Sequence, residues 1–314
     1  MSGTALSEND FWVNPEEFDI TVDDGVTIHV ARWAARDADA PVVLGIHGLT
    51  ATRFGMLPVA RAFNREVTFI AHDVRGRGLS GKPADSDSYG MRRNAEDAAA
   101  VLRHVGASDV VVVGQSNGAW VAEQLAAHHP ELVRGLVLGD GGYFRALEPG
   151  EEVRDRPRSI MGPQWLDRLR MVVPSRDMLI GAFRALPAFA DWWNEDVELL
   201  LNAGLEETES GVRSRCLDVA ADKDSIDYFT GDPHYVQADL ALITCPVHLV
   251  RGEHGFALSP ETMPPMISDA EIEEFKQRLP QLSVETVPGS NHYSVNFAPF
   301  GAEVIADAAR KLLT

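Results

Sequence analysis

Gly114-Gln115-Ser116-Asn117-Gly118 follows directly on the apolar, β-branched run 110–113 and directly precedes a helical pattern over 119–129. A serine at such a junction lies on a sharp turn from strand to helix, where flanking glycines avoid a side-chain clash as the two elements approach. The turn lifts the Ser116 hydroxyl over the sheet edge. It also places the Asn117 amide at a helix N-terminus, where the amide can stabilise negative charge. Alone, the pentapeptide is weak evidence for a reactive serine. Its position between a buried strand and a helix makes that evidence strong.

Short, continuously apolar segments alternate with amphipathic ones on both sides of this stretch. We expect strands over 18–22, 26–34, 42–46, 67–71, 110–113, 136–139, 247–250 and 283–287, and helices over 56–63, 89–105, 116–129, 269–279 and 302–313. The first two strands form a hairpin about Asp23-Asp24-Gly25. Buried strands separated by helices predict an α/β fold, with a mostly parallel eight-stranded sheet covered by helices on both faces.

The alternation stops over residues 143–240. This segment shows no convincing buried strand but holds acidic helical stretches and a group of aromatic residues, Phe183, Phe189, Trp192 and Trp193. An insertion of roughly a hundred residues is too long to be a loop. We therefore divide the chain into a first part of the sheet domain (1–142), a helical cap (143–240) and a second part of the sheet domain (241–314).

Composition and charge exclude several classes of partner. The 314 residues include 28 Lys and Arg against 47 Asp and Glu, for a formal net charge of −19. Nucleic acid and anionic membrane surfaces would repel such a chain. The two cysteines, Cys216 and Cys245, lack metal or redox spacing. Residues 1–18 carry no signal-peptide pattern, and no stretch is apolar enough to span a bilayer. We expect a cytoplasmic protein without metal or organic cofactor. The sequence carries no signal for an oligomeric state.

A serine hydroxyl is a poor nucleophile at neutral pH and needs an oriented general base. The candidate base is His292, which lies just after the last expected strand in Gly289-Ser290-Asn291-His292 and so at the same sheet edge as Ser116. The other histidines are scattered without ligand spacing, and we interpret them as structural. A second amide is needed beside that of Asn117 to bind an oxyanion. His47-Gly48-Leu49 follows the strand 42–46, and its glycine lets the Leu49 amide turn toward the same point.

Taken together, His47-Gly48, the stretch from Asp73 to Ser80, the pentapeptide around Ser116, and Gly289-Ser290-Asn291-His292 resemble the α/β-hydrolase fold superfamily. The resemblance covers nearly the whole chain outside 143–240. It implies that Ser116 is the nucleophile, that His292 is the base and that the Leu49 and Asn117 amides form the oxyanion hole. Serine at the elbow argues against dehalogenase and epoxide hydrolase chemistry, in which that position is an aspartate. Arg75 and Arg77 lie in a loop that we interpret as structural, with a contact to substrate left open.

The third member of the expected triad departs from the commonest superfamily pattern. After the strand 247–250 the chain reads Arg251-Gly252-Glu253-His254-Gly255, with glycine where an aspartate is expected. Asp140 stands at the end of the strand 136–139. This placement resembles superfamily members in which the triad acid follows the corresponding strand. We place the acid at Asp140, with Glu253 as the alternative. Arg53, soon after the oxyanion loop, is interpreted as a solvated residue at a helix start, with a substrate carboxylate as the alternative.

These residues predict a serine hydrolase that cleaves a small or medium carboxylic ester through an acyl-enzyme. Amides, lactones and carbon–carbon bonds are alternatives on the same machinery. A non-catalytic ligand-binding protein of the same fold is an alternative of another class, which the intact serine, histidine and oxyanion loop disfavour. The expected partner is a small acyl compound. Trp192 and Trp193 either line its pocket or form a small core within the cap.

Overall fold

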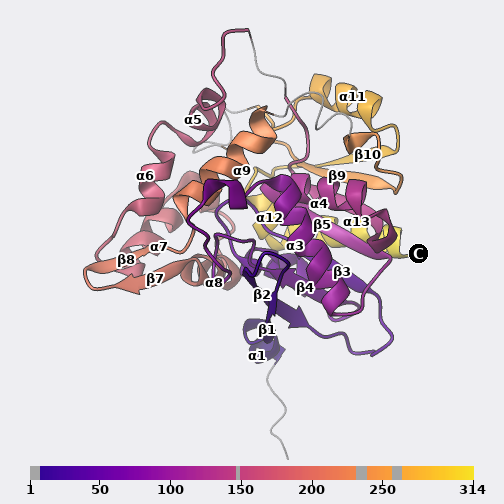
Figure 1. Cartoon of the computed structure of the whole chain (residues 1–314), viewed down its shortest axis with the longest axis horizontal. Coiled ribbons are helices and arrows are strands. Elements are labelled where there is room, and N and C mark those ends of the chain that lie inside the picture. The colour runs from indigo at the N-terminus through magenta and orange to yellow at the C-terminus, as the bar shows by residue number, and fades with distance from the viewer. Residues whose placement is uncertain (1–7, 146–148, 231–238, 257–263) are drawn as a thin grey trace, which may run out of the picture.

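The computed structural model describes residues 8–145, 149–230, 239–256 and 264–314. Figure 1 shows a sheet with its covering helices on one side of the molecule and the elements of the segment 143–240 on the other. The strands are β1 Glu16–Thr21, β2 Thr27–Trp33, β3 Val42–Ile46, β4 Thr68–His72, β5 Val110–Gln115, β6 Val133–Gly139, β7 Leu205–Thr208, β8 Gly211–Ser214, β9 Val247–Gly252 and β10 Leu282–Val287.

Outside the segment 143–240, the helices are α1 Glu8–Val13, α2 Leu57–Ala62, α3 Met91–His104, α4 Asn117–His128, α11 Asp269–Arg278, α12 Ser294–Phe297 and α13 Pro299–Leu313. A 3-10 turn, η1 Arg53–Met56, precedes α2. The helix α11 begins at a capping box, in which the Ser268 side chain accepts the Glu271 amide and the Glu271 side chain accepts the Ser268 amide. The short helices α1 and α12 lie outside the predicted set.

The main sheet has eight strands in the order β1-β2-β4-β3-β5-β6-β9-β10. From β4 to β10 every neighbouring pair is parallel, and β2 runs antiparallel to both of its neighbours. This confirms the predicted α/β class and the mostly parallel eight-stranded sheet. The carboxyl ends of β3, β5, β6 and β10 meet along one edge. The segments that follow these strands carry Leu49, Ser116, Asp140 and His292.

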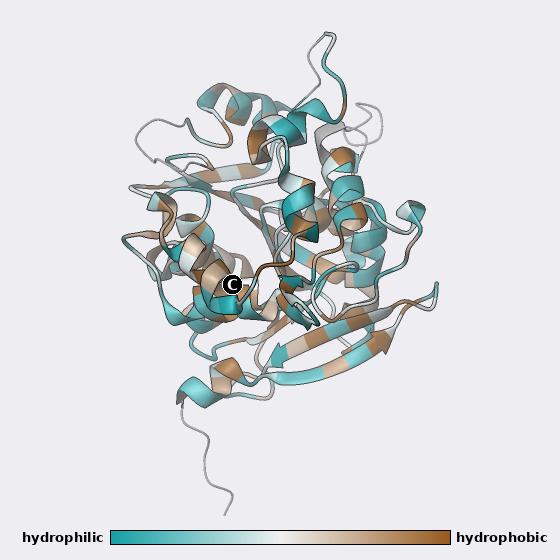
Figure 2. Ribbon diagram, turned by 90° about the vertical axis from the view of Figure 1, so that its left-hand side faces the viewer, coloured by the Kyte–Doolittle hydropathy of each residue, from teal (hydrophilic) through white to brown (hydrophobic). Residues whose placement is uncertain are grey.

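Alternate residues of the central strands enter two apolar cores, one on each face of the sheet. In β5, Val110 and Val112 pack with α3 and α4, whereas Val111 and Val113 pack with α2 and α13. A strand buried on both faces must be apolar throughout, and this is why the run 110–113 contains no polar residue. In Figure 2, many hydrophobic residues lie in the strands, and hydrophilic residues lie mostly on the outer helices and loops.

The segment 143–240 contains α5 Asp155–Met161, α6 Trp165–Arg170, α7 Arg176–Arg184, α8 Glu195–Ala203 and α9 Asp218–Thr230. It also contains the antiparallel hairpin β7–β8, which lies outside the predicted set of strands. The hairpin strands are four residues each and bury mainly Leu205 and Val212, so their apolar pattern is too short to stand out. None of the described helices combines the length and apolar character needed to cross a bilayer.

Candidate active site

Ser116 occupies the turn between β5 and α4 with φ 50° and ψ −118°, a left-handed conformation that is strained for a residue with a side chain. The glycines on either side of it allow the turn. A Cβ on Gly118 would lie 2.1 Å from the Ile46 carbonyl oxygen, and one on Gly114 would lie 2.4 Å from the Gly118 carbonyl oxygen. Both contacts are with backbone, which cannot rotate away. The expected steric reason for these glycines is therefore confirmed.

The structure brings three of the predicted residues into one hydrogen-bonded chain. The Nε2 atom of His292 lies 3.1 Å from the Ser116 hydroxyl oxygen, and its Nδ1 atom lies 2.7 Å from Oδ2 of Asp140. The Asp140 side chain is fully buried, and that of His292 is nearly so. The second carboxylate oxygen of Asp140 accepts the Gly252 amide at 3.0 Å, which fixes the carboxylate plane. An imidazole held this way presents a free electron pair on Nε2 to the serine hydroxyl.

Glu253, the alternative acid, does not contact Nδ1 of His292, which is bound to Asp140. Its carboxylate accepts the Gly289 amide at 2.7 Å, and half of its side chain is exposed. It therefore closes the turn after β10 from the outside. Asp140 reaches His292 because β6 is the strand next to β5, so the loop after β6 lies beside the serine turn.

The segments that carry the two candidate oxyanion donors both lie next to Ser116. The Asn117 amide is at the first position of α4, and a Cβ on Gly48 would lie 3.4 Å from the Ser116 Cβ. The loop that carries Leu49 thus passes directly over the serine. Within the described part of the chain, neither the Asn117 nor the Leu49 amide has a hydrogen-bond acceptor. Both N–H groups are available to a ligand.

His47 orients the peptide that carries the Leu49 amide. Its Nε2 atom accepts the Val74 amide at 3.0 Å, so Nδ1 bears the proton and donates it to the Gly48 carbonyl oxygen at 2.7 Å. A trans peptide points its N–H away from its C=O, and the Leu49 N–H therefore points away from His47. Complete burial lowers the pKa of His47 to about 4, so the ring is neutral at pH 7. The sequence indicated a turn that presents the Leu49 amide, but not how His47 holds that turn, because the Val74 contact joins two loops that are distant in the sequence.

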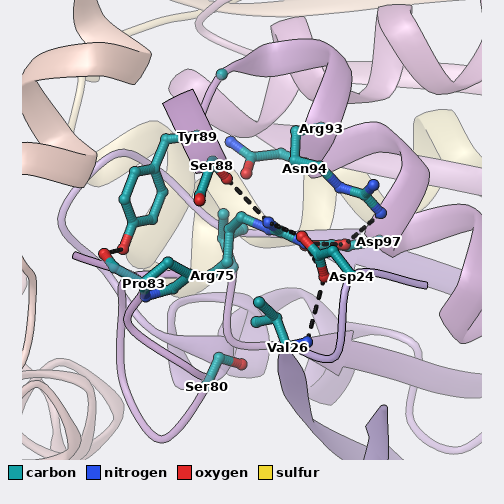
Figure 3. Close-up of polar contacts among 12 residues, drawn as sticks. Asp24, Val26, Arg75, Ser80, Pro83, Ser88, Tyr89, Arg93, Asn94 and Asp97 are labelled. Atoms are coloured by element: carbon teal, nitrogen blue, oxygen red, sulfur yellow. Dashed lines mark hydrogen bonds and ion pairs between the residues drawn. The ribbon is translucent and has the colours of Figure 1, made fainter. Parts of the chain in front are cut away.

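Arg53 is not the solvated helix-start residue that the sequence suggested. It is buried and forms ion pairs with Asp73 at 2.9 Å and with Glu17 at 2.5 Å. Arg75 is likewise buried, and Figure 3 shows its guanidinium between Asp24 and Asp97, with hydrogen bonds to both and to the Ser88 carbonyl oxygen. These arginines are committed to carboxylates of the protein. We therefore assign Arg53 and Arg75 structural roles.

Aromatic side chains surround the outer side of the histidine. Phe256 stacks on the His292 ring with centroids 4.8 Å apart, and Tyr293 packs against Phe189 of the insertion at 4.7 Å. Phe189 is also the centre of a cluster with Phe183, Trp192 and Trp193. The insertion's aromatic residues thus pack on one another, and their cluster joins the apolar core on one face of the sheet and reaches Tyr293, the residue next to the candidate base.

Among the described residues, no group of three or more His, Cys, Asp or Glu side chains is placed to hold a metal ion. Cys216 and Cys245 are both free thiols.

Comparison with known proteins identifies the family of the chain. A model of the alpha/beta hydrolase family matches residues 42–306. The 2-(acetamidomethylene)succinate hydrolase of Mesorhizobium japonicum is 26% identical over 263 residues, which are 82% of this chain and 84% of that protein. A crystal structure of E-2-(acetamidomethylene)succinate hydrolase matches with a TM-score of 0.76 and 21% identity, over 96% of this chain and 99% of the other. An N-formylmaleamic acid deformylase of Pseudomonas putida matches with a TM-score of 0.66 and 20% identity, over 93% and 100%. With most of its length matched by the family model, the chain belongs to the alpha/beta hydrolase family.

Proposed function

We propose that the protein is a serine hydrolase that cleaves a small or medium carboxylic ester. Ser116 attacks the acyl carbonyl while His292 takes its proton through Nε2, and Asp140 stabilises the imidazolium that forms. The Leu49 and Asn117 amides bind the oxyanion. His292 then gives its proton to the leaving alcohol, and water hydrolyses the acyl-enzyme by the same steps. The observation that carries this proposal is the buried chain of contacts from Asp140 through His292 to Ser116.

A fluorophosphonate probe tests the proposal without knowledge of the natural substrate. We expect it to label Ser116 with a stoichiometry of one per chain, and we expect p-nitrophenyl acetate or butyrate to be hydrolysed with a burst of p-nitrophenol. A wild-type protein that is neither labelled nor active on any short ester would contradict the proposal and support the alternative of a ligand-binding protein.

Cleavage of a carbon–nitrogen bond is a second candidate, favoured by the relatives. The 26% identical relative is named a hydrolase of an acetamido compound, and one structural match is named a deformylase of an amic acid. An amide differs in its leaving amine, which His292 must protonate before the bond breaks. Matched pairs of an ester and an N-acyl compound with the same acyl group distinguish the two candidates. The ester hypothesis predicts a far higher kcat/KM for the ester, whereas comparable values for the two would favour the amide.

We assign the segment 143–240 the role of a cap that shapes the substrate pocket. Two contacts support this role beside the candidate base. The Asn291 side chain donates to the Ala188 carbonyl oxygen at 3.0 Å, and Phe189 packs on Tyr293. Phe189→Ala is expected to raise KM and to change acyl-chain preference, while the rate of fluorophosphonate labelling stays within about threefold because no reacting group moves. An unchanged preference across acyl lengths would count against this role.

A further inference from the structure

Arg77 links the oxyanion loop to the insertion through a single buried guanidinium. Its Nε atom donates to the Leu49 carbonyl oxygen at 2.9 Å, and its Nη1 atom lies 2.6 Å from Oδ2 of Asp224 in α9. Both side chains are about 0–1% exposed. The guanidinium therefore holds the residue that carries a candidate oxyanion amide on one side and a cap helix on the other.

Asp224 is itself held firmly by the sheet domain. Its two carboxylate oxygens accept the Gly90 amide at 2.8 Å and the Asn94 side-chain amide at 3.0 Å, both at the start of α3. A carboxylate fixed by two hydrogen bonds in addition to the ion pair has little freedom to move, so it gives the guanidinium a fixed anchor.

The backbone segments that carry Arg77 and Asp224 are also in direct contact. The Leu217 amide donates to the Gly76 carbonyl oxygen at 2.8 Å, and a Cβ on Gly76 would lie 2.4 Å from the Ala220 Cβ. The start of α9 thus rests directly on the loop that carries Arg77. A shift of α9 relative to the sheet would move Asp224, and with it the guanidinium that holds Leu49.

We propose that Arg77 and Asp224 are a positioning pair, through which docking of the cap sets the place of the Leu49 amide in the oxyanion hole. This inference rests on the proposed hydrolase function. Leu49 is held at its carbonyl by Arg77, while the peptide before it is held by His47 at the Gly48 carbonyl. Because the Gly48 and Leu49 carbonyl groups are both held, the Leu49 N–H between them is held in a single orientation. Loosening either contact lets the amide move from the point where negative charge develops.

Arg77→Lys is the primary test, and Arg75→Lys is its matched control. A lysine keeps the charge beside Asp224 but offers one point of contact, so it cannot also reproduce the donor that holds Leu49. Arg75 is buried in the same loop and paired with Asp97, but the backbone oxygen that its guanidinium contacts belongs to Ser88 and not to the loop that carries Leu49 (Figure 3). Both substitutions leave a buried carboxylate with a weaker partner, and both are expected to lower the melting temperature.

We expect Arg77→Lys to lower kcat for p-nitrophenyl acetate, and the rate of fluorophosphonate labelling, by about 10- to 100-fold with little change in KM. This is less than the loss of an entire oxyanion donor. Arg75→Lys is expected to stay within about threefold of wild type at temperatures equally far below each melting point. Equal losses in the two variants, or an unchanged labelling rate in Arg77→Lys, would overturn the inference.

Asp224→Asn approaches the pair from the cap side and serves as the second variant if Arg77→Lys does not fold. Hydrogen exchange of the amides over residues 47–52 gives a readout independent of activity. We expect exchange there to be faster in Arg77→Lys and Asp224→Asn than in Arg75→Lys. A wild type without turnover or labelling would contradict the proposed function, and the exchange result would still decide the coupling. Equal exchange in all three variants would overturn it.

Discussion

The turn around Ser116 and the segment 143–240 are held together in different ways. In the turn, backbone meets backbone: Gly114, Gly118 and Gly141 each have carbonyl or Cα atoms within 2.6 Å of where a Cβ would stand. In the insertion, the short helices are joined through side chains, both by ion pairs near the surface, such as Arg176–Glu207 and Arg184–Glu198, and by the aromatic cluster around Phe189.

This contrast explains why we expect the two regions to differ in how far they tolerate substitutions. A side chain can change rotamer to relieve a contact, but backbone in a packed core can move only by displacing its neighbours. Exposed ion pairs contribute roughly 0–1 kcal/mol each and can be rearranged. We therefore infer that the groups proposed to react lie in the more rigid part of the molecule, and that the segment 143–240, which we propose shapes the substrate pocket, is the more adaptable one.

Removal of the proposed nucleophile tests the rigid region most severely. Ser116→Ala is expected to lower kcat by on the order of a thousandfold or more and to abolish fluorophosphonate labelling, since no other group takes over the attack. Circular dichroism should be unchanged. Labelling that persists in this variant would move the nucleophile elsewhere and remove the basis of the comparison.

Neutralising Asp140, the proposed acid of the triad, is expected to have the next largest effect. Asp140→Asn keeps the shape of the side chain but no longer stabilises the imidazolium, and kcat should fall by about 10³- to 10⁴-fold at pH 7. Glu253→Gln is the control, because glutamine keeps an oxygen to accept the Gly289 amide, and it should change kcat by less than about twofold. The reverse pattern would mean that Glu253 is the acid.

A pair of glycine substitutions compares the two regions directly. Gly118→Ala is expected to lower the free energy of unfolding by about 3 kcal/mol or more, because its methyl group meets the Ile46 carbonyl. Gly181 lies in α7 of the insertion, where a Cβ would have no atom within 4 Å, so Gly181→Ala should raise stability by roughly 0.5–1 kcal/mol. Urea unfolding measures both. Similar effects at the two positions would end the distinction between a rigid and an adaptable region.

A pH-dependent effect is expected from Glu123 in α4. Its carboxylate is buried, and neither oxygen has a hydrogen-bond partner among the described residues. Burial raises the pKa of Glu123 well above its ordinary value. The folded protein therefore keeps a proton that the unfolded chain releases, so this residue makes stability fall as pH rises above the unfolded pKa.

Glu123→Gln removes that titration. We expect the stability of the variant relative to wild type to increase from pH 5 upward, by at most about 1.4 kcal/mol per pH unit until the folded pKa is reached. Unfolding curves of both proteins at pH 5, 6, 7 and 8 measure the difference. A difference that stays constant over this range would show that the residue ionises in the folded protein much as it does in the unfolded chain.

Much of the fold could be predicted from the sequence because its signals are local. The apolar runs of the sheet and the periodic helices between them predict elements whose observed ends differ by a few residues, as for α3 and β6. The β7–β8 hairpin could not be predicted, because two four-residue strands on a partly exposed surface have little pattern. The prediction of a solvated Arg53 was wrong, because its partners Asp73 and Glu17 come from separate parts of the chain.

For the site, the residues alone were enough to locate the turn at Ser116, since glycines within two residues of the serine allow a strained backbone that other residues would block. They also narrowed the base to His292 and the acid to Asp140 or Glu253. Packing of the sheet was needed to bring Asp140 beside His292, because strand order decides which loops become neighbours. The sequence likewise does not indicate that the loop carrying Leu49 is fixed by the side chains of His47, Arg77 and Asp224. Those contacts join side chains from distant parts of the chain, and their geometry arises only when the sheet and the insertion pack together.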